Sequence, residues 1–154
     1  MSQAQSYANH SLYMASIMID AWRRAETAKE HAAPAIDAAF APATRLHLLD
    51  AYGWQLLACQ RAVNLPSDPP HSARALPSLA SGIAVSPEVR EMANLEQAGW
   101  LAELLSPIAP GLSPRRPQNV LAATREQFDS ASAAKIYEKL EALLCRVSDA
   151  IDES

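Results

Sequence analysis

Glycine is scarce in this chain, with four glycines among 154 residues. Phosphate-binding loops and the nucleophile elbow of hydrolases both need glycines at short, fixed spacings. The sequence contains no glycine cluster of that kind and no Gly-x-Ser-x-Gly. It therefore nominates neither a nucleotide site nor a serine nucleophile.

Cysteine is scarcer still: Cys59 and Cys145 each stand alone among apolar neighbours. Zinc sites need paired cysteines or a Cys/His cluster, and di-iron bundles need Glu-x-x-His motifs on two helices. Neither pattern occurs. We expect two reduced thiols in the core, no metal and no cofactor.

Charge is also low, because Asp, Glu, Lys and Arg make up 19% of the chain and the net charge is −4. Nucleic-acid binders carry a basic face, whereas the longest basic runs here are Arg23-Arg24 and Arg115-Arg116. No apolar run reaches the roughly 18 residues of a membrane-spanning helix. The first residues lack the basic and apolar regions of a secretory signal. We expect no nucleic-acid partner, no membrane partner and a cytoplasmic location.

What the chain does contain is apolar residues at helical spacing in four separate stretches, with alanine as the commonest filler. Serine, proline and glutamate at 86–88 form a good helix start, with the serine as N-cap. The pattern predicts an all-α fold, a bundle-like single domain over 1–154 with four main helices. We place these helices at 2–31, 44–64, 86–105, and from 124 or 130 to the C-terminus.

Two proline- and serine-rich segments separate these helices. The first, 66–86, is predicted to be a long crossover with room for one short helical turn, and the second, 106–123, a proline-rich connection. Pro34 is predicted to end the first helix, and Pro42 to lie before or in the first turn of the second. Gly53, in the middle of the second helix, predicts close approach of another helix.

A ligand or metal site is one open alternative. His47 and Asp50 lie three residues apart on the second helix, and Asp20 on the first helix could join them. The simpler interpretation is that all three are solvated polar residues, since the motif of a metal-binding bundle is missing.

Tryptophan offers a second alternative, because Trp22, Trp54 and Trp100 fall one on each of the first three helices. Large aromatic residues at helical spacing usually fill a core, but they are also enriched at interfaces. The first helix is predicted to be longer than its neighbours, which would leave part of its stripe uncovered. We predict a homodimer interface there, unless the apolar residues of the crossover cover the stripe. The predicted interface residues are Ala15, Ile19, Trp22, Arg23 and Arg24.

Several short segments also resemble a family of small uncharacterised all-helical proteobacterial proteins, a domain of unknown function. They are residues 21–26, 46–48, 51–53, 100–105, 119–122 and 125–128. The resemblance implies a compact helical bacterial protein, and it brings no activity or functional residue with it.

These observations favour a non-catalytic interaction or structural protein that self-associates or binds another protein. The alternative is a small-ligand or metal-binding helical bundle, which could be an enzyme.

Overall fold

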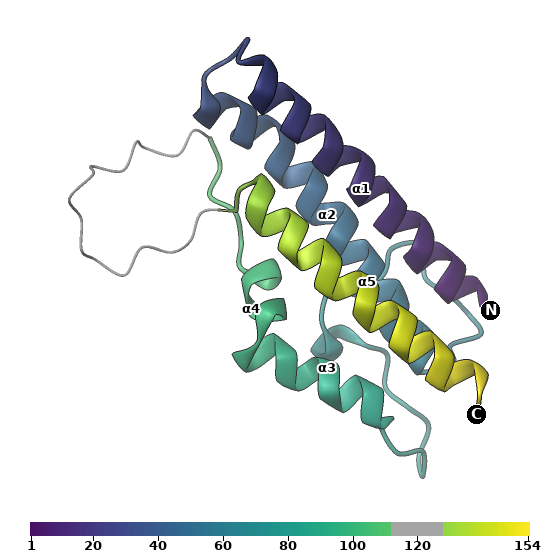
Figure 1. The fold of residues 1–154 in the computed structure, drawn as a ribbon. Coiled ribbons are helices and arrows are strands. Elements are labelled where there is room, and N and C mark those ends of the chain that lie inside the picture. Colours follow the sequence, from purple (N-terminus) through teal and green to yellow (C-terminus); the bar gives the residue numbers. More distant parts are fainter. Residues whose placement is uncertain (112–127) are drawn as a thin grey trace.

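The computed structural model describes residues 1–111 and 128–154. This part of the chain is all-α, as predicted, and it contains no strand. Figure 1 shows α1, α2 and α5 side by side, with α3 and α4 along one side of the group. The helices are α1 (Gln3–Ala28), α2 (Ala33–Cys59), α3 (Pro87–Ala98), α4 (Trp100–Leu105) and α5 (Ser130–Asp152), and a 3₁₀ turn, η1, spans Ala73–Ala75.

The first two helices form a long antiparallel pair. α1 opens with a capping box, in which the Ser2 side chain accepts from the Gln5 backbone and the Gln5 side chain accepts from the Ser2 backbone. It ends at Lys29, which adopts the left-handed conformation with φ of 53°. A short turn then leads directly into α2.

The predicted start of the second helix near 44 is wrong. α2 begins at Ala33, with Pro34 in its first turn and Pro42 in its interior. An interior proline costs roughly 3 kcal/mol because it removes a hydrogen bond and crowds the preceding turn. Packing along α1 outweighs that cost. α2 therefore has 27 residues against 26 in α1, and α1 does not extend beyond its neighbour.

The predicted third helix is divided into two. Ser86 caps α3 as expected, since its hydroxyl accepts from the Val89 N–H at 3.2 Å. The helix then stops at Gly99, which is extended (φ −116°, ψ −167°) and starts α4. The Arg45 side chain of α2 caps the C-terminal end of α4, because it donates hydrogen bonds to the carbonyls of Leu104 and Leu105 at 3.0 and 3.1 Å.

The last helix begins at Ser130, one of its two predicted starts. Asp129 is its N-cap and accepts from the Ser132 N–H at 2.8 Å. The other start, near 124, and most of the expected 106–123 connection lie outside the described residues. Arg146 of α5 pairs with Glu91 of α3 through two hydrogen bonds, of 2.6 and 3.1 Å, on the surface.

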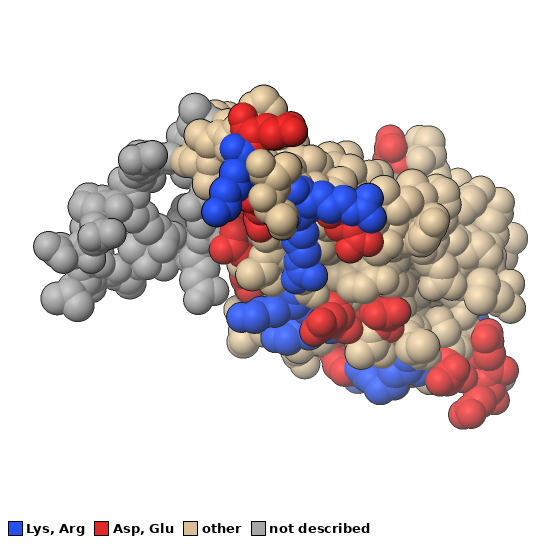
Figure 2. All heavy atoms as spheres, turned by 45° about the horizontal axis from the view of Figure 1, so that its top comes forward, with Lys and Arg blue, Asp and Glu red and all other residues tan. Residues whose placement is uncertain are grey.

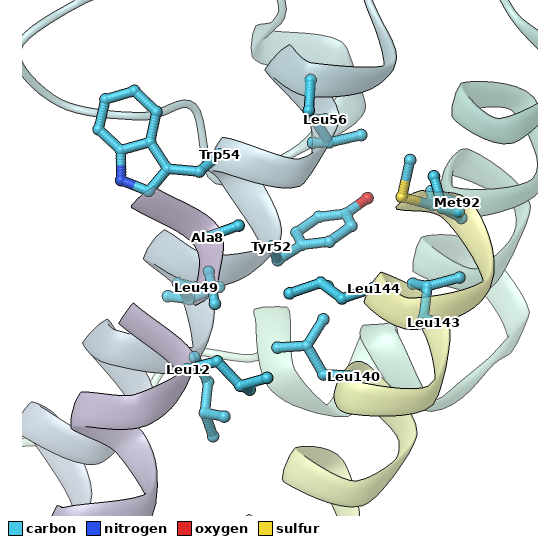
Figure 3. Close-up of a cluster of buried hydrophobic side chains, with 14 of the residues drawn as sticks. Ala8, Leu12, Leu49, Tyr52, Trp54, Leu56, Met92, Leu140, Leu143 and Leu144 are labelled. Carbon is cyan, nitrogen blue, oxygen red and sulfur yellow. The ribbon is translucent and has the colours of Figure 1, made fainter. Parts of the chain in front are cut away.

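The core lies between α1, α2 and α5 and is closed by α3. Figure 3 shows Leu12, Leu49, Tyr52, Leu140 and Leu144 converging between three helices, with Met92 of α3 on the far side. A second cluster surrounds Trp22 near the turn between α1 and α2. The expectation for cysteine is half right: both thiols are free, but Cys59 is buried and Cys145 is exposed.

Candidate functional site

The structure does not assemble a metal site from the residues that the sequence nominated. Asp20 is exposed on α1, on the side of Tyr137 of α5, while His47 is half-buried on α2. Asp50 faces the crossover instead, where its Oδ1 lies 2.8 Å from Nε2 of His71. Within 1–111 and 128–154 no group of three His, Cys, Asp or Glu side chains could hold a metal ion.

The interface predicted on α1 is also placed on the wrong side of that helix. Ala15, Ile19 and Trp22 are buried inside the protein, and only Arg23 and Arg24 are exposed. Trp22 donates its indole N–H to Asp37 of α2 at 3.0 Å. The physical reason is the early start of α2, which runs along the whole of α1 and covers this stripe.

The opposite side of α1, which we call the outer face, is formed by Ser6, His10, Tyr13 and Ile17. All four are exposed, and their spacings of four, three and four residues place them on one side of the helix. Two are large apolar or aromatic residues, with Tyr13 62% and Ile17 45% exposed. No Asp, Glu, Lys or Arg precedes Asp20 in the chain.

Figure 2 shows the consequence for the surface. Charged side chains gather on the left of the described part, whereas the right side, where α1 begins, is mostly uncharged apart from an acidic side chain at its upper edge and charged side chains along its lower edge. At this end Tyr7 packs edge-on against Trp54, with ring centroids 4.9 Å apart. These two rings and Pro66 line a shallow hollow of about 290 Å³ beside the outer face.

The crossover is tied to α2 and α3 at several points. The Tyr52 hydroxyl of α2 donates to Oε1 of Glu96 on α3 at 2.5 Å, and the same oxygen accepts the Ala73 N–H of η1 at 2.7 Å. Burial, with Glu96 beside the hydroxyl, raises the pKa of Tyr52 far above its usual value. The hydroxyl is therefore a hydrogen-bond donor and does not act as a base, and the Glu96 oxygen that it contacts links three elements.

Gly53 explains how the crossover comes so close to α2. A Cβ built at this residue would lie 1.9 Å from the carbonyl oxygen of Pro70. The close approach expected at Gly53 is therefore made by the crossover backbone and not by another helix.

This docking leaves a groove of about 700 Å³ between the crossover and α3. Its walls are largely apolar, and Ile83 and Val85 remain 60% and 42% exposed. Arg74 of η1 and Arg90 of α3 also line it. Its apolar side chains are Leu76, Leu79, Ile83, Val85, Val89 and Ala93.

Sequence reasoning noticed the apolar residues of the crossover but not their destination. The alternative to the dimer was that Leu76, Leu79 and Ile83 of the crossover cover the stripe on the first helix, whereas they line a groove against α3. Nothing in the local pattern identifies Arg74 and Arg90 as neighbours of one groove, since 15 intervening residues separate them in the sequence.

The thiol of Cys59, buried at the end of α2, is not prepared for bond-making chemistry. Burial, with the carboxylate of Glu88 nearby, raises the pKa of the Cys59 thiol to about 12. A thiol that stays protonated is a poor nucleophile.

No helix in the described part of the chain is both long and apolar enough to cross a membrane. In comparisons with protein-family models, with curated proteins and with solved structures, nothing matches this chain.

Proposed function

We propose that this protein is a non-catalytic interaction protein that forms a homodimer through the outer face of α1. The observation that carries the proposal is the charge-free stretch 3–19, which exposes Tyr13 and Ile17 one helical turn apart. The proposal keeps the dimer expected from the sequence and moves its interface to the other side of the helix.

The composition of this face supports the proposal. The centres of protein interfaces are depleted in charged residues and enriched in tyrosine and other aromatic residues. On a monomer, exposed apolar residues that gather in one place mark an interaction site. A two-fold dimer would bring both copies of this face together. Because the face carries no Asp, Glu, Lys or Arg, the contact would not bury a charge that needs a partner.

Sedimentation equilibrium at micromolar concentration tests the proposal. We expect the wild-type protein to form dimers and the Tyr13→Lys, Ile17→Lys double variant to stay monomeric, because lysines opposite one another repel. Both residues are exposed, so the variant keeps its core. Leu46→Lys is the matched control: it charges an exposed apolar residue of α2 outside the outer face, and the dimer should persist. A monomeric wild-type protein, or a dimer unaffected by the double variant, would overturn the proposal.

Small-ligand binding is the second candidate function, and the groove between the crossover and α3 is the observation that favours it. This candidate differs from the metal site that the sequence suggested at Asp20, His47 and Asp50, which the described part of the chain does not assemble. Asp20, His47 and Asp50 are not among the residues that line this groove.

We also propose a cytoplasmic location and membership of the proteobacterial family that the sequence resembles. The free and exposed Cys145 supports the first part, since a reducing compartment preserves such a thiol. Localisation of a tagged chain in a bacterial cell tests it, and a periplasmic signal would contradict it.

A further inference from the structure

We infer that the groove between the crossover and α3 binds a small amphipathic carboxylate, an aliphatic chain that ends in one anionic group. This inference is independent of the dimer, because the groove lies on other elements of the fold. It depends on the shape of the groove, on its apolar walls and on the charges at its edge.

The size and lining of the groove suit such a ligand. Small-molecule sites occupy about 300–1,000 Å³ and are lined mainly by apolar side chains with a few polar groups, and this groove measures about 700 Å³. Ile83 is 60% and Val85 42% exposed, so the described part of the chain leaves much of both side chains open to water. An aliphatic chain lying along the groove would remove these side chains from water.

The charged residues of the groove indicate that the ligand carries a negative charge. Arg74 and Arg90 are exposed, and neither guanidinium has a hydrogen-bond or ion-pair partner among the residues that the structure describes. The carboxylate that lines the groove, Glu96, already accepts hydrogen bonds from Tyr52 and Ala73. Two arginines that have no partner in the described part of the chain thus stand at an apolar groove, in a chain whose net charge is −4. A carboxylate is the group that an arginine fork binds best.

The groove is also formed in advance of binding. Glu96 holds η1 against α3, and Gln60 of α2 donates to the carbonyl of Pro77 at 3.3 Å. The crossover is thus fixed on both sides of Leu76, so a ligand would not have to order this part of it. Preorganisation of this kind lowers the cost of binding.

Calorimetric titration with decanoate tests the inference, with decanol as the uncharged probe of the same length. We expect saturable binding of one decanoate per chain, and affinity that rises by up to about fourfold for each CH₂ added between octanoate and decanoate. Decanol should bind more weakly than decanoate. Equal binding of decanol and decanoate would overturn the role of the arginines, and no saturable binding would overturn the site.

Variants locate the site. Arg74→Gln and Arg90→Gln should each weaken decanoate binding roughly three- to tenfold and leave decanol binding unchanged. Ile83→Ser should weaken the binding of both probes. Arg23→Gln is the matched control, because Arg23 is also exposed but lies on α1, and it should have no effect.

All four positions are exposed, so these variants keep the fold, which circular dichroism verifies. If the substitutions at Arg74, Arg90 and Ile83 leave the affinity for decanoate unchanged, the ligand binds elsewhere and the inference is refuted. An acidic, apolar peptide that saturates the groove where decanoate does not would refute the small-molecule form.

Discussion

Tyr52 of α2 and Glu96 of α3 are joined by a hydrogen bond of 2.5 Å between the phenol and a carboxylate oxygen. Tyr52 is fully buried, and Figure 3 shows its hydroxyl pointing toward the side of Met92, where α3 lies. The same carboxylate oxygen accepts the Ala73 N–H, so this one contact joins α2, α3 and the crossover. It is the polar link on which the groove depends.

Tyr52→Phe should therefore destabilise the protein by roughly 1.5–3 kcal/mol, the usual contribution of a hydrogen bond to a charged group. Chemical denaturation with urea measures the loss. Glu91→Gln is the control: it weakens the surface ion pair with Arg146 and should cost no more than about 1 kcal/mol. If both variants unfold at the same urea concentration as the wild type, the contact contributes nothing to stability.

Gly53→Ala should also destabilise the protein, although alanine normally stabilises an interior helix position by roughly 1 kcal/mol. The added methyl group would collide with the carbonyl oxygen of Pro70, and backbone cannot move aside as a flexible side chain can. A lower melting temperature is the expected result. A stabilised Gly53→Ala protein would show that the crossover does not lie against α2.

Stability should fall as the pH rises above about 9, the ordinary range of a cysteine thiol. The pKa of Cys59 is raised to about 12 in the folded protein, so the folded state holds a proton that the unfolded state releases first. The thiol thus contributes its full stability below about pH 9, and up to about 1.4 kcal/mol is lost per pH unit between the two pKa values. The raised pKa of Tyr52 acts in the same direction, from about pH 10 upward.

Two cysteine variants test whether the buried thiol causes this loss of stability at high pH. Cys59→Ala should show a smaller loss of unfolding free energy between pH 9 and 11 than the wild type, when urea titrations are run across about that range. Cys145→Ser removes an exposed thiol and should follow the wild-type curve. If Cys59→Ala also follows it, the buried thiol does not govern alkaline stability.

Leu140→Asp and Leu49→Asp should each abolish the folded state, as judged by far-ultraviolet circular dichroism. Both leucines are buried in the main core, and an unpaired buried carboxylate costs several kcal/mol against a total stability of about 5–15 kcal/mol. Leu46→Asp is the control, since Leu46 is half exposed and its carboxylate would remain in water. A folded Leu140→Asp protein would contradict the position of α5 in the core.

The sequence by itself determined the features that depend on a few neighbouring residues. The cap at Ser86, the short turn in the crossover and the helix that starts at Ser130 follow from hydrogen-bond geometry and helical period, which are local. These features were enough to predict an all-α fold.

Only the tertiary structure decided which surfaces remain open for binding. Pro42 stays inside α2 because packing against α1 compensates for the lost hydrogen bond, and the longer α2 then covers Ala15, Ile19 and Trp22. The groove likewise exists because Pro70 fits against Gly53 and Ala73 binds Glu96. These contacts join residues 17 and 23 positions apart in the sequence, and no local pattern specifies which residues distant in the chain will meet.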